Sequence, residues 1–428
     1  VVGAYADDIG SNTDQGSAYV FTRSGSGWVF QQKLTASDGA ASDNFGNSVA
    51  IDGDTIVVGA YLDDIGANSN QGSAYVFTRS NGVWSQQAKL SANNGQANHS
   101  FGHSVAIDGD TIAINSYYAT STYIFSREGI FWSQQQQLGL AGGGAASDGD
   151  CPGSISLSGN TLAVGMPRYS NSGGSPNYLK GAVVIFTRPG STWTEQIKLF
   201  ASDPASYTNF GNSVSLSGNT LAVGAYNKDE PGQGDQGAVY IFTTDGSSWS
   251  QQAKLLASDG LTDDRFGSSI SLLGDTLLVG APGDDFPQII GTNADQGSAY
   301  VFKRSGSSWS QYAKFSDNSG SAGDAFGSAV ILAGDTMLAT SPLDDVSATN
   351  QGSLISQNIN LASASTTITV GTNNSNPTAS FSTVPATLQG PLTVAELNFS
   401  EIVTGVDLSD FELFKDSTPL SLASAILS

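Results

Sequence analysis

The chain is poor in the residues that most often carry catalysis or covalent cross-links. It has one cysteine, Cys151, and two histidines, His99 and His103, among 428 residues. A single cysteine cannot form an internal disulfide, which excludes a disulfide-stapled secreted module. So few histidines leave Ser-His-Asp, Cys-His and His-rich zinc sites poorly supplied. No apolar run approaches the roughly 18 residues needed to cross a membrane, so we expect no direct membrane insertion.

Positive charge is also scarce. The chain has 16 Lys and Arg against 38 Asp and Glu, which gives a formal net charge of −22 at pH 7. A field of this sign repels nucleic acid and anionic membrane surfaces, so we expect no nucleic-acid partner. It suits cations, basic partners or a salty exterior. Charged residues make up only 13% of the chain, and its many uncharged polar residues are typical of extracellular β proteins.

What the sequence does contain is an internal repeat of four short segments. The first runs from Phe45 to Ile51, and its Phe-Gly start returns at Phe101, Phe210, Phe266 and Phe326. The second runs from Asp54 to Ala60, the third from Gln71 to Phe77 and the fourth from Trp84 to Leu90. The tryptophan that opens the fourth segment recurs about every 56 residues. Four short segments in such a period indicate a propeller blade and not a helical solenoid.

Each segment is predicted to be a strand. The segments are short, rich in β-branched residues and bounded by turn residues. Asp52-Gly53, between the first two, is typical of a type I′ hairpin. The strands are apolar at nearly every position, as expected when blades pack face to face. We expect Phe45 to wedge between blades and Gly46 to allow close backbone approach. No stretch of the first 360 residues shows a helical period, so helix content should be near zero.

Besides the Phe-Gly pair, several units have a triplet related to Gly-Ala-Pro at the end of the second predicted strand, as in Gly280-Ala281-Pro282 and Gly59-Ala60-Tyr61. This combination resembles the FG-GAP repeats of integrin α-chain heads, and most closely their bacterial variety. The resemblance implies an all-β fold, a seven-bladed β-propeller of four-stranded antiparallel blades over residues 1–371. The units are 1–36, 45–90, 101–138, 153–199, 210–255, 266–315 and 326–361.

The end units are incomplete, so ring closure needs other strands. The first unit lacks its Phe-Gly strand, and we expect it to come from residues upstream of Val1 or from a neighbouring molecule. The seventh lacks its tryptophan strand, and we expect Thr366 to Val370 to add there as the outer strand. The fourth unit has Asp150 to Gly153 where Phe-Gly should stand, so it should be irregular, with Cys151 as a small buried side chain.

The pattern changes near Thr372. Residues 372–378 are predicted to be a linker, and residues 379–428 resemble the start of a bacterial Ig-like domain through Ser400 to Val406 and Leu408 to Phe411. These residues are too few for a complete sandwich. We therefore expect a partial Ig-like β-sandwich and a native protein that continues beyond Ser428.

Recurring acidic residues are the candidate metal ligands. They lie between the second and third strands of several units: Asp7, Asp8, Asp14, Asp63, Asp64, Asp229, Asp235, Asp284, Asp285, Asp295, Asp344 and Asp345. Calcium takes oxygen ligands from such flexible loops. The alternative is that these aspartates form turns and cap the loop backbone. In calcium-binding FG-GAP repeats the acidic loop joins the first two strands, which here is too short, so the resemblance supplies no ligands. Calcium is the one cofactor the sequence suggests.

Three functions fit these observations. The leading hypothesis is an extracellular or cell-surface adhesion or scaffold protein, of bacterial type, that binds a protein or glycan through one propeller face. The alternative is a structural subunit of an extracellular fibre or surface layer, assembled from copies of itself. The second alternative is a polysaccharide-active enzyme. We expect no enzyme activity, because the carboxylates recur with the repeat, and we interpret His99 and His103 as an exposed loop pair.

Overall fold

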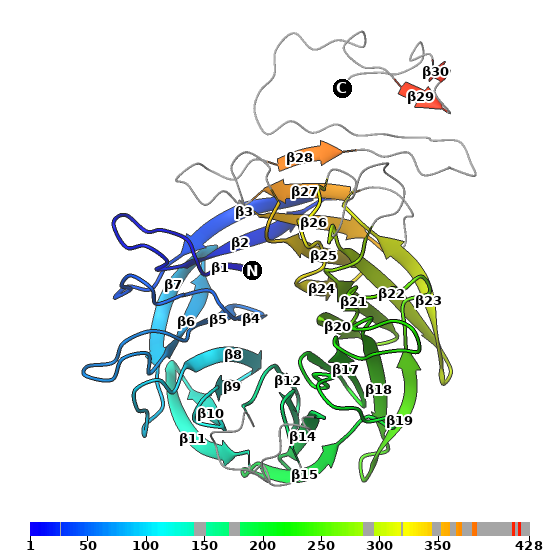
Figure 1. The fold of residues 1–428 in the computed structure, drawn as a ribbon. Helices are drawn as coiled ribbons and strands as arrows, with labels where there is room; N and C mark the ends of the chain where they lie inside the picture. Colours follow the sequence, from blue (N-terminus) through cyan, green and yellow to red (C-terminus); the bar gives the residue numbers. More distant parts are fainter. Residues whose placement is uncertain are drawn as a thin grey trace, which may run out of the picture.

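The computed structural model describes residues 1–428 except 26, 141–150, 171–179, 286–294, 318–319, 345–351, 360–364, 370–378, 383–412, 416–417 and 421–428. The described elements are all strands. Seven sheets follow one another around a central axis, so the predicted seven-bladed propeller is confirmed (Figure 1). In the described part of the chain, no helix is long and apolar enough to span a membrane.

The blades follow the repeat units in order. The first blade has three strands, β1 (Val2–Ala4), β2 (Ser17–Ser24) and β3 (Gly27–Leu34). Five four-stranded blades follow: β4 (Val49–Asp52), β5 (Thr55–Ala60), β6 (Ser73–Ser80), β7 (Val83–Leu90); β8 (Phe101–Asp108), β9 (Thr111–Ser116), β10 (Ser121–Glu128), β11 (Phe131–Gly139); β12 (Ile155–Ser158), β13 (Thr161–Met166), β14 (Ala182–Thr187), β15 (Thr194–Leu199); β16 (Val214–Ser217), β17 (Thr220–Ala225), β18 (Ala238–Thr244), β19 (Trp249–Leu255); β20 (Ser269–Leu273), β21 (Thr276–Ala281), β22 (Ser298–Ser305), β23 (Ser308–Phe315). The seventh has β24 (Val330–Ala333), β25 (Thr336–Ser341), β26 (Ser353–Asn358), β27 (Ser365–Thr369) and β28 (Ala379–Ser382).

Tight turns join the first and second strand of each blade. In the second blade Asp52 pairs with Thr55, so the turn residues are Gly53 and Asp54. Gly53 has a φ of 54°, whereas Asp54 has no positive φ. The predicted type I′ turn is therefore wrong, because that type needs a positive φ at both turn residues. A glycine at the first position alone fits type II′.

The hydrophobic core lies between neighbouring blades. Phe45 is fully buried and packs with Ala18 and Val20 of the first blade and with Tyr75 of the second. A Cβ added to Gly16 would lie 2.0 Å from the Phe45 carbonyl oxygen, and one added to Gly46 would lie 2.3 Å from the Ser17 carbonyl oxygen. The expected roles of Phe-Gly are confirmed: the ring fills the space between blades, and the glycine permits backbone contact.

Side chains also tie the blades together where no strand ladder joins them. On the inner strands, serine hydroxyls donate to the glycine carbonyl of the next Phe-Gly pair, from Ser48 to Gly102 at 2.8 Å and from Ser269 to Gly327 at 2.7 Å. On the outer strands, the Gln32 amide donates to the Trp84 carbonyl at 2.7 Å and accepts from the Trp84 N–H at 2.9 Å. These contacts link consecutive blades at both the axis and the rim.

The ring closes between the first and seventh blades, which lie side by side in Figure 1. Tyr19 and Phe21 of β2 pack with Leu354 of β26. The expected outer strand is confirmed over residues 366–369, because β27 pairs antiparallel with β26; Val370 lies outside the described residues. As expected, no Phe-Gly strand stands inside β1 among the described residues. Among the described residues, the contact between the two blades is apolar packing, and β27 completes the seventh blade.

The C-terminal residues contribute two features. β28, which falls in the segment that resembles an Ig-like domain, pairs with β27 at the edge of the seventh blade. β29 (Leu413–Lys415) and β30 (Thr418–Leu420) form an antiparallel pair. The predicted linker 372–378 and the stretches Ser400 to Val406 and Leu408 to Phe411 lie outside the described residues.

Candidate ligand-binding face

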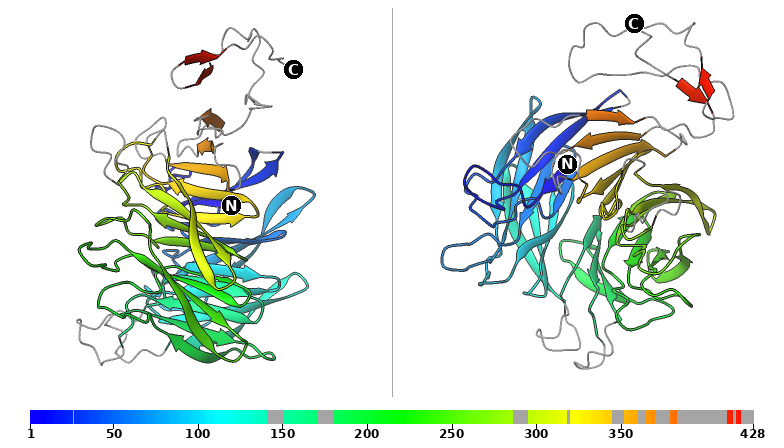
Figure 2. Two further views of the ribbon diagram at one scale, coloured as in Figure 1. Left: turned by 90° about the vertical axis from the view of Figure 1, so that its right-hand side faces the viewer. Right: turned by 45° about the horizontal axis from the view of Figure 1, so that its top comes forward.

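The antiparallel order of each blade gives the propeller two unlike faces. The loop face carries the connections between second and third strands and the connections from one blade to the next. The hairpin face carries the turns between first and second strands and between third and fourth strands. The two faces are seen edge-on in the left view of Figure 2. All the predicted acidic residues that the structure describes lie on the loop face, because they occur between second and third strands.

In the first, second and sixth blades, the first aspartate of the acidic pair is buried and ion-paired. Asp7, Asp63 and Asp284 lie 2.7 Å from the ammonium groups of Lys33, Lys89 and Lys314, respectively, which come from the fourth strand of the same blade. A serine hydroxyl of the third strand also donates to each of these carboxylates. A lysine therefore neutralises each of these three buried carboxylates, which were predicted as calcium ligands.

The second aspartate of each pair is exposed and closes its own loop. An oxygen of Asp8 accepts the N–H of Asp14 at 2.9 Å, and Asp64 accepts the N–H of Asn70 at 2.8 Å. Asp229 with Asp235 at 2.8 Å and Asp285 with Asp295 at 2.9 Å repeat this contact. The residues at the end of the loop have a positive φ, from 49° at Asp235 to 57° at Asp295. These contacts are those of the alternative interpretation, in which the aspartates cap turns.

The remaining candidates are placed as follows. The Asp344 carbonyl accepts the N–H of Gly352 at 3.0 Å, and Asp345 lies outside the described residues. Among the described residues, no group of three or more His, Cys, Asp or Glu side chains is arranged to hold a metal ion. Of the predicted acids, Asp8 contacts Asp14 and Asp229 contacts Asp235. In the first and second blades, the first acid of the pair binds a lysine and the second caps the loop backbone.

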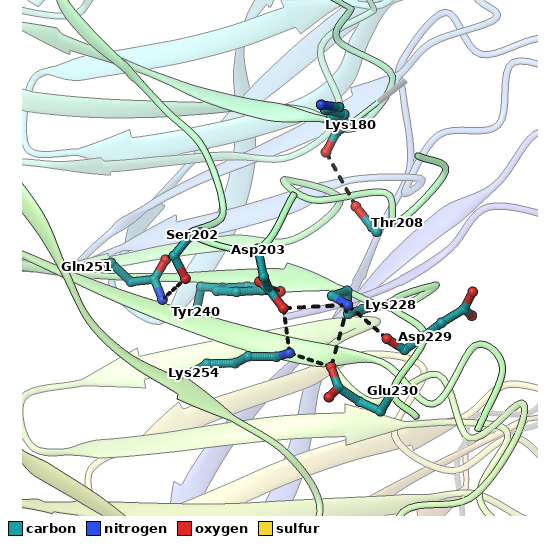
Figure 3. Close-up of polar contacts among 10 residues, drawn as sticks. All are labelled: Lys180, Ser202, Asp203, Thr208, Lys228, Asp229, Glu230, Tyr240, Gln251 and Lys254. Atoms are coloured by element: carbon teal, nitrogen blue, oxygen red, sulfur yellow. Dashed lines mark hydrogen bonds and ion pairs between the residues drawn. The ribbon is translucent and has the colours of Figure 1, made fainter. Parts of the chain in front are cut away.

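Ionic networks link the acidic loops of the second, fifth and sixth blades to the preceding blade connection. In the fifth blade, Lys254 of β19 lies 2.8 Å from Asp203, which follows β15, and also contacts Glu230 of the loop after β17 (Figure 3). The Tyr240 hydroxyl donates to Asp203 at 2.7 Å. Lys228 occupies the position that Asp63 holds in the second blade, and it lies 3.5 Å from Asp203 and 3.6 Å from Glu230. The reversed charge at one position is thus offset by an acid two residues later.

The network shifts the titration of its members. Burial lowers the pKa of Lys254, but hydrogen bonds to Asp203 and Glu230 outweigh it and raise the pKa above its usual value. Burial raises the pKa of Asp203, but hydrogen bonds from Lys254 and Tyr240 outweigh it and lower the pKa. Two acids in the connections before Phe-Gly pairs behave differently. Burial raises the pKa of Asp43 to about 6 and that of Asp264 to about 7, although each accepts one backbone N–H.

An aromatic cluster on the same face departs from the repeat. The rings of Tyr61 and His103 lie 5.8 Å apart, those of His103 and Tyr117 4.7 Å, and those of Tyr117 and Tyr118 4.9 Å. Tyr61 follows β5, His103 lies in β8, and the other two follow β9, so the cluster joins the second and third blades. A bulge in β8 between Phe101 and Ser104 offsets His103 from the regular ladder. We call these four residues the aromatic cluster.

The histidine interpretation needs correction. His103 is half-buried, burial lowers its pKa, and its Nδ1 has no hydrogen-bond partner among the described residues. The exposed-loop interpretation is wrong for His103, because the bulge turns it against the Tyr117 ring. Cys151 is buried as expected. Burial and the neighbouring Cys151 raise the pKa of Tyr117, whereas Arg168 lowers it.

One departure from the repeat in the sequence indicates this cluster. The residue after Phe-Gly is Asn47, Asn212, Ser268 or Ser328 in four units and His103 in the third. Departures from a repeat are informative, because repeated residues are already explained by contacts between blades.

Comparison with known proteins matches the repeat to a family. The FG-GAP repeat family matches residues 28–77, 84–125, 193–242, 249–302 and 309–354, more than half of the chain. Each match starts in or next to the fourth strand of one blade and ends in the third strand of the next, so the sequence repeat is offset from the blade by one strand. Integrin alpha-M of Mus musculus is 28% identical over 156 residues, which are 33% of this chain and 12% of that protein. The chain therefore spans only a small part of that relative.

A solved structure gives a further comparison. Sqt1 of Saccharomyces cerevisiae covers 79% of this chain and 95% of its own, at 10% identity and a TM-score of 0.42.

Proposed function

Because the chain belongs to the FG-GAP repeat family, we propose that it is an extracellular or cell-surface binding protein that holds its ligand on the loop face. The observation that carries this proposal is the aromatic cluster, which lies on that face and includes His103 and Tyr118, two departures from the repeat. The partial similarity to integrin alpha-M supports an adhesion-type role. Bacterial origin is part of the same proposal.

The scaffold suits such a role. Serine and glutamine side chains tie neighbouring blades at the axis and at the rim. The lysine and aspartate networks fix the base of each described acidic loop. A surface held in this way loses little conformational freedom on binding, which favours affinity. Variation at a few loop positions can then change the ligand without disturbing the ring.

The function is tested with purified protein immobilised on a biosensor and exposed to panels of matrix proteins and polysaccharides. Tyr118→Ala alters the loop face, and Phe131→Ala alters the hairpin face; the two side chains are 63% and 73% exposed. We expect saturable binding that Tyr118→Ala weakens and Phe131→Ala leaves unchanged. Binding that only Phe131→Ala weakens, or no binding to either panel, would contradict the proposal.

We propose that the protein has no catalytic turnover. The buried acids of the repeat pair with lysines and the exposed ones cap backbone N–H groups, contacts that fit a structural role. We expect no hydrolysis or lyase products when the protein is incubated with polysaccharides. Sustained turnover lost on changing one carboxylate pair would favour the enzyme alternative instead.

Weak calcium binding belongs to the same proposal. Asp8, Asp64 and Asp285 are exposed and use one described oxygen in capping. The expected affinity is that of extracellular modules, about 10⁻⁴ to 10⁻³ M. The melting temperature in EDTA should then be slightly lower than in millimolar calcium. Equal melting temperatures and no calorimetric heat would exclude calcium.

A further inference from the structure

Two members of the aromatic cluster, His103 and Tyr118, have no counterpart in the other blades. The slot of Tyr61 and Tyr117, directly after the second strand, also holds tyrosine in the first and fifth blades and proline in the last two, so the adjoining His103 and Tyr118 are what set this cluster apart. The core beneath the cluster is already complete, since Phe101 and Tyr123 are fully buried. The four rings therefore add apolar surface above a finished core.

Part of this surface faces solvent. The Tyr118 side chain is 63% exposed, while Tyr61, His103 and Tyr117 are half-buried. Each ring lies against the next at 4.7–5.8 Å, which fixes their orientation. The exposed rings are thus held in place by one another, as a preorganised binding surface requires.

The four side chains of the cluster include no acid, and their one basic side chain is His103. Burial lowers the pKa of His103, which favours its neutral form. Arg168 lowers the pKa of Tyr117, so one cation lies near the cluster. A strongly basic partner would find its complement at the exposed aspartates and not here.

The ligand that matches a neutral aromatic surface with hydroxyl groups is an uncharged sugar. The C–H face of a pyranose ring is apolar and packs on an aromatic face, while its hydroxyls need donors and acceptors. Three tyrosine hydroxyls, each able to donate and accept, lie in the cluster. Peptide binding by strand addition would need a free strand edge, and the cluster follows the ends of β5 and β9 instead.

We propose that Tyr61, His103, Tyr117 and Tyr118 form a binding site for uncharged pyranose units of a polysaccharide. The proposal rests on the proposed function and names the ligand class of the loop face. Tyr118 forms the exposed stacking surface, and Tyr61, His103 and Tyr117 hold it and complete the floor.

The test is affinity electrophoresis in native gels containing a neutral β-glucan, xylan or mannan, with polygalacturonate as the charged comparison. Wild-type protein is expected to be retarded by at least one neutral polysaccharide and not by polygalacturonate. Tyr118→Ala should raise the dissociation constant about tenfold, the loss of one aromatic stacking contact. Tyr118→Phe should keep most of the retardation.

The matched control is Tyr5→Ala. Tyr5 occupies the same slot in the first blade as Tyr61 in the second and is 53% exposed, but it lies outside the cluster. Tyr5→Ala should leave retardation unchanged, and both alanine variants should melt like the wild type. No retardation by any neutral polysaccharide, or equal loss in both variants, would overturn the inference.

The two proposals fail differently. If the protein binds a matrix protein through the loop face but no neutral polysaccharide, the inference is overturned and the proposed function stands. If it binds neither panel, both are overturned.

Discussion

At the scale of single residues, the buried lysine–aspartate pairs explain why acidic residues recur. Asp63 is buried and receives the Lys89 ammonium at 2.7 Å, the Ser73 hydroxyl and, from the same third strand, the Tyr75 hydroxyl at 3.4 Å. Asp38 of the preceding connection also lies 2.7 Å from Lys89. The pair thus fixes an acidic loop and the neighbouring blade connection together.

Replacing Lys89 should show how much the buried ion pair contributes to the free energy of unfolding. Lys89→Met leaves Asp63 buried without its counter-charge, so we expect the free energy of unfolding to fall by about 2–3 kcal/mol. Asp54→Asn is the control, since the Asp54–Arg79 pair at 2.6 Å is largely exposed and should contribute under about 1 kcal/mol. Urea unfolding monitored by tryptophan fluorescence measures both. Equal effects of the two substitutions would contradict the structural role of the buried pair.

Asp264 should make stability depend on pH. Its folded pKa of about 7 lies above the ordinary value of 3.8, so the folded state holds a proton that the unfolded state releases between those values. The contribution is therefore fully present below about pH 4 and is lost as the pH rises through about 7, by up to about 1.4 kcal/mol per pH unit.

The variant Asp264→Asn isolates this effect. The amide cannot ionise, yet its oxygen can still accept the Leu261 N–H that Asp264 accepts at 2.6 Å. We expect the variant to gain stability relative to the wild type as the pH rises from 5 to 8. A difference between the two that stays constant over this range would show that Asp264 is not protonated in the folded state.

At the scale of elements, β27 completes the seventh blade, which packs against the first blade where the ring closes. It pairs with β26 along Ser353 to Gln357 and replaces the tryptophan strand that the seventh unit lacks. Thr367, opposite Ile355, lies in the middle of this ladder. Deleting residues 363–370 would leave β26 with unpaired backbone groups and an uncovered edge.

We expect this deletion to lower the free energy of unfolding by several kcal/mol. Thr367→Pro should reproduce much of the loss, because proline breaks a strand ladder, whereas Thr367→Ala should cost little. Thermal unfolding followed by circular dichroism compares all three. Melting temperatures equal to that of the wild type would mean that the ring closes without β27.

The strand elements were largely predictable because the repeat presents the same evidence many times. The Phe45-Gly46 pair marks the start of a blade in the sequence, and the short apolar segments between turn residues are strands in the structure. The turn type at Gly53 was not predictable, because the strand pairing places Gly53 and Asp54 in the turn instead of Asp52 and Gly53, and the sequence pattern does not fix that register. The aspartate contacts were also beyond the sequence alone. Whether Asp63 faces a lysine or a metal depends on the distance across two strands to Lys89, which spacing does not fix.

At the scale of the whole molecule, repeated residues stabilise the ring, and we propose that the exceptions to the repeat serve binding. Consecutive blades are joined by buried aromatic rings, inner-strand serines and outer-strand glutamines. Variation that would weaken a smaller domain is tolerated on the loop face, because the loops lie outside this framework. The far-ultraviolet circular dichroism spectrum should accordingly show β structure, and a helix content above about a fifth would contradict the propeller.

The central claim is that ligand binds the loop face at the second and third blades. Hydrogen–deuterium exchange, measured with and without the polysaccharide or matrix protein that binds most tightly in the panels, locates the contact directly. The account predicts slower exchange in residues 61–70 and 98–120 on ligand binding, with no change in the hairpins at residues 80–83 and 128–131. Protection confined to those hairpins would contradict it.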